Sequence, residues 1–294
     1  MFDRPKVATS QNPSAKSYRK CFKNEHFVFG LSLLLVWFID ENGSADRTNE
    51  IEKCMETKAS LKKLGLSGSF AIYIPAAALM FVLTKFLIPY LAQETGYETI
   101  LFWFLVAGFG IFTPLIIVAF MILRSEGFKL SKKTWTERLR FRRVSKRDFI
   151  WGILGLLIAG ALSGLLMKGM EFFIGKFDHS PAFMSFEPLT SGRYWLLLVW
   201  APYWILNILG EEILWRGVML PRQDLAFGKF TWIIHGFGWG LFHVAFGWQL
   251  LITLIPLIFI QSFVVQQTKN SWVGVIMHGG LNGPAFLAIC FGLV

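Results

Sequence analysis

The sequence predicts an all-α polytopic membrane protein with about eight membrane-embedded helices. Hydrophobic residues make up 54% of the 294 residues and charged residues only 16%, and the mean hydropathy is +0.51. A soluble domain of this composition would expose large apolar patches to water. The apolar runs are continuous and long enough for membrane helices, whereas the strands of an outer-membrane barrel alternate polar and apolar residues.

Residues 1–69 are predicted to be a basic N-terminal segment with a short hydrophobic helix and a polar connector. Residues 1–25 carry six Lys or Arg against two acids, and residues 27–39 are an apolar run of thirteen residues. Such a run makes about 20 Å of helix, less than the roughly 30 Å of a hydrocarbon core. It either spans the membrane or lies in the interface.

Residues 70–294 are predicted to form the membrane domain. Seven apolar segments are expected there, at residues 70–91, 99–123, 149–167, 194–220, 230–248, 250–265 and 272–294. Pro221 is expected to end the segment at 194–220, because proline cannot continue a helical hydrogen-bond ladder. The segment at 149–167 carries Gly152, Gly155, Gly160 and Gly164, which predicts close packing against neighbouring helices.

The positive charge indicates topology. The formal charge is +10, and residues 124–148 alone hold ten Lys or Arg against three acids. Basic loops favour the cytoplasmic side. We therefore expect a protein of the cell membrane with residues 1–69 and 124–148 in the cytoplasm and residues 92–98 on the outer side. The lipid bilayer is the expected partner, and no nucleic acid is.

The three cysteines are Cys21, Cys54 and Cys290, without a CxxC spacing. They predict neither a disulfide framework nor a zinc knuckle.

The stretch EEILWRG at residues 211–217 places two carboxylates and an arginine after sixteen uncharged residues, 194–209. An ionisable group at membrane depth costs about 2.5–3.5 kcal/mol on insertion scales and therefore indicates a functional site. Glu212 and Arg216 are four residues apart, with the acid first, which favours an ion pair. That pairing leaves Glu211 free for proton transfer. The alternative is that all three charges lie at the interface and anchor the helix.

Three more polar side chains are expected at similar depth. If residues 221, 230 and 272 mark one membrane face, then Glu211, His243, His278 and Asn282 lie about 13, 20, 9 and 15 Å deep at 1.5 Å per residue. They would share an intramembrane cavity that opens toward the cytoplasm. His235 is expected only to link helices, as such hydrogen bonds commonly do, and His179 to be a solvated loop residue.

This set of side chains predicts a hydrolase. Glu211 and His243 can hold and deprotonate a water, while His278 and Asn282 can donate to an oxyanion. No GxSxG motif supplies a serine nucleophile. No cofactor is expected. Two histidines and a glutamate could alternatively ligate zinc, although the sequence has no HExxH.

The three motifs resemble those of the CPBP family, the CAAX-protease and bacteriocin-processing intramembrane proteins. The stretch EEILWRG resembles the family's EExxxR, Trp239-x-x-x-His243 its FxxxH, and His278-x-x-x-Asn282 its HxxxN/D. They occur in the family's order within residues 194–294, the expected catalytic core. The resemblance implies an eight-helix glutamic endopeptidase in which Glu211 and His243 activate water. It also implies that His278 and Asn282 form the oxyanion hole, with Glu212, Arg216 and Trp239 in support.

One position departs from the pattern and the substrate stays open. Trp239 stands where the family has phenylalanine, and the larger indole is expected to narrow the cavity. The resemblance implies a peptide or protein substrate, prenylated or not. Two other functions stay open: a noncatalytic membrane partner that keeps the fold, such as a bacteriocin-immunity or scaffold protein, and a transporter with Glu211 and His243 as a proton relay.

Overall fold

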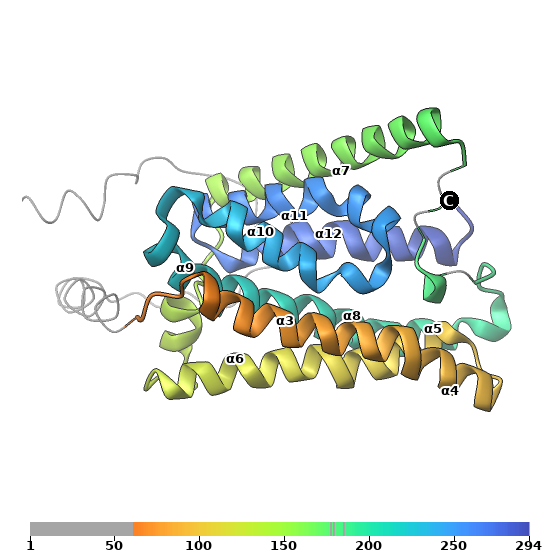
Figure 1. Cartoon of the computed structure of the whole chain (residues 1–294), viewed down its shortest axis with the longest axis horizontal. Coiled ribbons are helices and arrows are strands. Elements are labelled where there is room, and N and C mark those ends of the chain that lie inside the picture. Colours follow the sequence, from red (N-terminus) through yellow and green to blue (C-terminus); the bar gives the residue numbers. More distant parts are fainter. Residues whose placement is uncertain (1–60, 177, 179, 185, 294) are drawn as a thin grey trace, which may run out of the picture. The chain divides into compact units, whose positions relative to one another are not determined.

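The computed structural model describes residues 61–293 apart from 177, 179 and 185 (Figure 1). The chain divides into two units, Met1–Asn42 and Gly43–Val294, and all described residues belong to the second. The predictions for residues 27–39, Cys21, Cys54 and His179 lie outside the described residues. The predicted boundary between residues 69 and 70 stays a prediction.

The described residues form helices and loops, and no strand occurs among them. The α-helices are α3 (Leu66–Val82), α4 (Ile88–Thr95), α5 (Thr99–Phe102), α6 (Thr113–Ser125), α7 (Lys146–Ile174), α8 (Trp195–Glu211), α9 (Leu220–Phe227), α10 (Thr231–Phe242), α11 (Trp248–Thr268) and α12 (Ser271–Cys290). Three π-helical segments continue them: η1 (Leu83–Leu87), η2 (Trp103–Phe112) and η6 (Glu212–Met219). Figure 1 shows the longer helices side by side with roughly aligned axes.

Six helices are long and apolar enough to cross a membrane: Leu66–Thr95, Thr99–Ser125, Lys146–Ile174, Trp195–Phe242, Trp248–Thr268 and Ser271–Cys290. The chain is therefore an all-α polytopic membrane protein, as predicted. The range Trp195–Phe242 contains two predicted segments, because the chain reverses near Gly228, whose φ is +54°. Contacts from residue 223 to 235 and from 211 to 239 show that α10 runs back along the preceding helix.

The helix that carries EEILWRG does not end at Pro221, contrary to the prediction. It continues through η6 into α9 and ends at Phe227. Proline has no N–H for the carbonyl four residues earlier, that of Gly217, and a buried carbonyl needs a donor. Arg138 supplies it: its Nη1 donates to the Gly217 carbonyl at 2.9 Å and its Nη2 to Val218 at 3.3 Å.

The basic segment 124–148 holds the site helices together as well as carrying charge. Arg138 is 2% exposed and pairs with Glu126 at 2.8 Å, and Arg140 pairs with Asp224 on α9 at 3.0 Å. Ser271, the first residue of α12, donates its hydroxyl to the Leu139 carbonyl at 2.7 Å. This segment thus joins the end of the EEILWRG helix to the start of α12.

Contacts between loops show which loops share an end of the helices. The Leu64 amide donates to Arg222 at 3.1 Å and the Ser271 amide to Arg140 at 2.9 Å. At the opposite end, Arg193 pairs with Glu98, and the Leu189 amide donates to Cys290 at 2.8 Å. Gln266, near the end of α11, donates to the Gly228 carbonyl at 2.7 Å. Residues near 221, 230 and 272 therefore lie at one end of the helices.

Helix α7 packs closely through only part of its glycine series. A side chain at Gly152 would meet Val273 on α12 at 3.3 Å, and one at Gly155 would meet Met277 at 2.8 Å. Gly160 and Gly164 have no atom within 4 Å of such a side chain in the described part of the chain. Close packing is therefore confirmed for Gly152 and Gly155 and wrong for Gly160 and Gly164.

Candidate functional site

The adjacent carboxylates of Glu211 and Glu212 contact different helices. Glu211 ends α8 and faces α10, whereas Glu212 begins η6 and faces α11 and α12. Successive side chains on a helix project about 100° apart, so one helix serves both neighbours. π-helical turns occur often at functional sites, and η6 contains both Glu212 and Arg216.

Glu211 contacts Trp239 on α10 and lies near His243, which directly follows α10. Its side chain is 1% exposed, and its Oε2 accepts a hydrogen bond of 2.5 Å from Trp239 Nε1. His243 Nε2 lies 4.0 Å from the same oxygen, beyond direct hydrogen-bond reach. The predicted proximity of Glu211 and His243 is therefore present, with a gap between their polar atoms.

Glu212 is the centre of a second group of polar contacts. Its Oε1 lies 3.2 Å from Arg216 Nη1, accepts from Gln261 Nε2 at 2.8 Å, and lies 3.1 Å from His278 Nδ1. Its Oε2 has no hydrogen-bond partner among the described residues, and a side chain at Gly274 would collide with it. The predicted ion pair with Arg216 is present, and the contact with His278 adds to it.

The histidine tautomers follow from these contacts. His243 Nδ1 lies 2.9 Å from the Trp239 carbonyl, which only accepts, so Nδ1 carries a proton and Nε2 of the neutral ring is an acceptor. An ionised Glu212 likewise requires a proton on His278 Nδ1. The Nε2 atom of His278 can then donate only when the ring is doubly protonated.

Asn282 is not brought into contact with the other candidate residues. It is half-buried, one turn beyond His278 on α12, and its side chain makes no hydrogen bond among the described residues. Its place beside His278 follows from the helix alone, since positions i and i+4 share a face.

The comparisons match the region that carries these residues. Residues 193–283 match the family described as Type II CAAX prenyl endopeptidase Rce1-like. This similarity supports the CAAX protease-like family for the matched region. The region contains every candidate residue from Glu211 to Asn282. No curated protein and no solved structure matches the chain.

The glycines of the Rce1-like region allow close helix contacts. A side chain at Gly238 would collide with Tyr73 on α3, and one at Gly236 would meet Phe259 at 2.6 Å. Side chains at Gly279 and Gly283 would each come within 3.2 Å of Trp204 on α8. Close contact between helices therefore accounts for glycine at these four positions.

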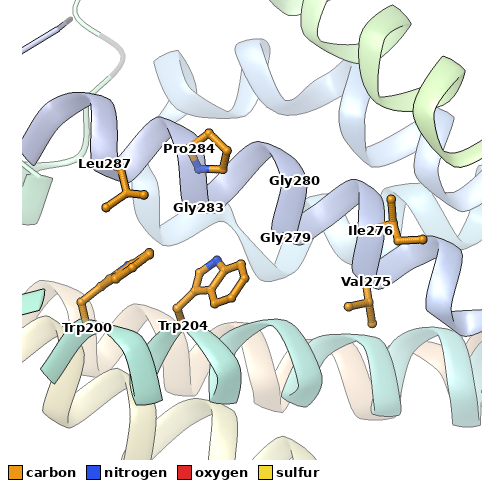
Figure 2. Close-up of a pocket in the computed structure, with 9 residues that line it drawn as sticks. All are labelled: Trp200, Trp204, Val275, Ile276, Gly279, Gly280, Gly283, Pro284 and Leu287. Atoms are coloured by element: carbon orange, nitrogen blue, oxygen red, sulfur yellow. The ribbon is translucent and has the colours of Figure 1, made fainter. Parts of the chain in front are cut away.

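An apolar groove of about 430 Å³ runs between α8 and α12 of the Rce1-like region. In Figure 2, Trp204 lies across from Gly279 and Gly283, and Trp200 lies across from Leu287. The rest of the lining is Val275, Ile276, Gly280 and Pro284. None of the candidate catalytic side chains lines this groove, although Gly279 and Gly283 directly follow His278 and Asn282 in sequence.

His235 links helices, as predicted. Its Nδ1 lies 3.0 Å from the Tyr73 hydroxyl on α3 and 2.7 Å from Gln223 Oε1 on α9. Neither contact involves Glu211 or Glu212, and His235 thus joins α10 to α3 and α9.

Sequence reasoning missed Gln261 and Asn207. Gln261 is fully buried in α11 and donates to Glu212. Asn207 is 5% exposed on α8, one turn before Glu211, and its Oδ1 has no hydrogen-bond partner among the described residues. Both could have been found as amide side chains inside long apolar runs, since polar groups are costly at membrane depth and therefore indicate a functional or structural role.

The residues of the alternative zinc site, Glu211, His243 and His278, are not grouped around one point. Among the described residues, no three His, Cys, Asp or Glu side chains are placed to hold a metal ion. Glu211 and His243 face each other, while His278 Nδ1 is directed to Glu212.

Proposed function

We propose that the chain is an intramembrane endopeptidase that hydrolyses a peptide bond with a water activated by Glu211 and His243. The observation that carries this proposal is the 4.0 Å approach of His243 Nε2 to Glu211 Oε2, within a region whose family consists of proteases. Both side chains are almost fully buried in a protein of membrane-crossing helices. A carboxylate and an imidazole are the usual bases for activating water.

The gap between the two side chains suits one bridging water. A water can donate one hydrogen to His243 Nε2 and the other to Glu211 Oε2, because both atoms are acceptors when His243 is neutral. Glu211 removes a proton as the water oxygen bonds to the substrate carbonyl carbon. The tetrahedral intermediate then breaks its C–N bond, and the leaving nitrogen takes up the proton.

His278 and Asn282 are proposed to stabilise the oxyanion. The Asn282 amide is a donor in every protonation state, and His278 donates from Nε2 when doubly protonated. Glu212, at 3.1 Å from Nδ1, is the counter-ion that this form of His278 requires. Donors aimed at a developing oxyanion account for a large part of catalysis in such sites.

The apolar groove beside His278 and Asn282 supports an apolar peptide or protein segment as substrate, with or without a prenyl group. Its lining is almost entirely apolar and includes Trp200 and Trp204, which suits an apolar segment. We propose that the protein resides in the cell membrane and that the site opens toward the cytoplasm, the side favoured by the basic segment 124–148.

We propose that the reaction needs no metal, because Glu211 and His243 suffice as bases and His278 is directed to Glu212. Candidate substrates are first identified by comparing the membrane peptides of cells that carry wild-type protein with those of cells that carry Glu211→Gln. The purified protein is then tested for cleavage of these peptides. We expect Glu211→Gln to abolish cleavage at unchanged thermal stability, and wild-type activity to survive EDTA and phenanthroline. Full activity of Glu211→Gln would refute the base, and activity lost to chelators and restored by zinc would make these residues ligands.

A further inference from the structure

Trp239 contacts more of the site than any single candidate base does. It is 1% exposed, and its indole N–H donates to Glu211. The centre of its ring lies 3.6 Å from Cζ of Arg216, and its backbone carbonyl accepts from His243 Nδ1. The ring also makes edge contacts with His243 and His278, at centroid distances of 5.4 and 5.6 Å.

The two parts of the indole act on two different charges. The N–H group occupies Oε2 of Glu211, which fixes the rotation of that carboxylate relative to His243. The Arg216 guanidinium lies over the ring face. None of its three nitrogens has a hydrogen-bond partner among the described residues. The guanidinium is therefore held by the ion pair with Glu212 and by the cation–π contact, which is strong when desolvated.

We infer that Trp239 is a positioning residue for the proposed hydrolysis, which orients Glu211 through its N–H and holds Arg216 beside Glu212 through its ring. A phenylalanine at this position provides a ring face and no donor. Of these two residues, only tryptophan can supply the hydrogen bond to Glu211. This inference rests on the proposed function.

Two substitutions separate the two roles. Trp239→Phe keeps a ring for Arg216 and removes the donor to Glu211, so we expect kcat to fall about tenfold or more, as for a lost hydrogen bond to a charged group, with KM within about twofold. Trp239→Leu removes donor and ring, so we expect the same loss of kcat together with a lower melting temperature than Trp239→Phe.

Trp215→Phe is the matched control. Trp215 is fully buried, stacks on Tyr73 at 4.8 Å, and its Nε1 has no hydrogen-bond partner among the described residues. This change removes the same indole atoms from the same core, so we expect a similar shift in melting temperature and kcat within about threefold of wild type. Wild-type kcat in Trp239→Phe, or an equal loss of kcat in Trp215→Phe, would overturn the inference.

A spectroscopic measurement tests the contact without catalysis. In protein labelled with ¹⁵N-tryptophan, the Trp239 indole signal is identified by its absence in Trp239→Phe. We expect its N–H proton downfield of the other indole signals and shifted upfield in Glu211→Gln, which removes the anionic acceptor. An unchanged signal would overturn the inference. Absence of any wild-type cleavage would refute the proposed function instead and leave this measurement valid.

Discussion

At the scale of residues, Glu212 has more partners than local spacing indicates. The i, i+4 spacing predicts the pair with Arg216, and the structure adds His278 and Gln261 to the same oxygen. Glu212 is therefore both a structural anion and the residue that orients a proposed oxyanion donor. Glu211, by contrast, lies 4.0 Å from His243, and we propose that a water binds in this gap.

We predict that Glu212→Gln lowers both stability and activity. The neutral amide leaves Arg216 buried without an anion, and breaking a buried pair costs about 3–5 kcal/mol. It also deprives His278 of its counter-ion, so kcat should fall in whatever protein remains folded. Thermal unfolding and single-turnover kinetics of detergent-purified protein measure the two effects. A melting temperature equal to that of Glu211→Gln would contradict this prediction.

We predict that Asn282→Ala lowers kcat by about 10²–10³, the usual effect of one lost oxyanion donor. KM should change little, because these bonds strengthen in the transition state. Steady-state kinetics with a cleaved peptide measure both constants. Normal kcat with raised KM would instead show that this amide holds the substrate.

At the scale of elements, the helix carrying EEILWRG depends on a side chain from another segment. Pro221 leaves the Gly217 carbonyl without its helical donor, and Arg138 donates to it while pairing with Glu126. A side chain at Gly217 would also meet Leu139 at 3.0 Å. The 134–145 region therefore positions the motif helix without touching the carboxylates.

We predict that Arg138→Met destabilises the fold by about 3 kcal/mol. Two carbonyls lose their donor, at a cost of about 1–3 kcal/mol for each unsatisfied buried acceptor, and Glu126 keeps only Arg222, at 3.6 Å, as a paired cation. Arg138→Lys should lose less stability than Arg138→Met but should still be less stable than wild type. An ammonium keeps the positive charge but cannot make the paired hydrogen bonds of a guanidinium. The exposed Arg143 offers a control, and Arg143→Met should unfold like wild type. Equal thermal unfolding of Arg138→Met and Arg143→Met would refute the role of Arg138.

At the scale of the whole molecule, the loops at one end of the helices carry most of the positive charge. Residues 61–66, 124–148, 222–229 and 268–272 meet at this end through the contacts of Leu64, Arg140 and Ser271. Basic loops are retained in the cytoplasm, so this end should face inward.

We predict that Lys133→Cys, at the basic end, reacts with a membrane-impermeant maleimide only after permeabilisation. Tyr97→Cys, at the opposite end, should react in intact cells. Both native side chains are exposed, and the three native cysteines are replaced in both proteins. Labelling of Lys133→Cys in intact cells would reverse the topology.

The class of the protein follows from the sequence, which also indicates most of the candidate site residues. Apolar runs of membrane length admit only helices, because backbone groups in lipid must bond within their own segment. Glu211, His243 and His278 could be found because polar groups are costly at that depth. Glu212 and Arg216 could be paired because their spacing is local.

The division of these residues into a group around Glu211 and a group around Glu212 is visible in the tertiary structure alone. The contacts from Trp239 to Glu211, from His278 to Glu212 and from Arg138 to Gly217 join residues 28, 66 and 79 positions apart. Such contacts depend on how each helix is rotated about its axis and how deeply neighbours interlock. Rotation is set by packing at positions such as Gly238 against Tyr73, and no periodicity along one segment encodes it.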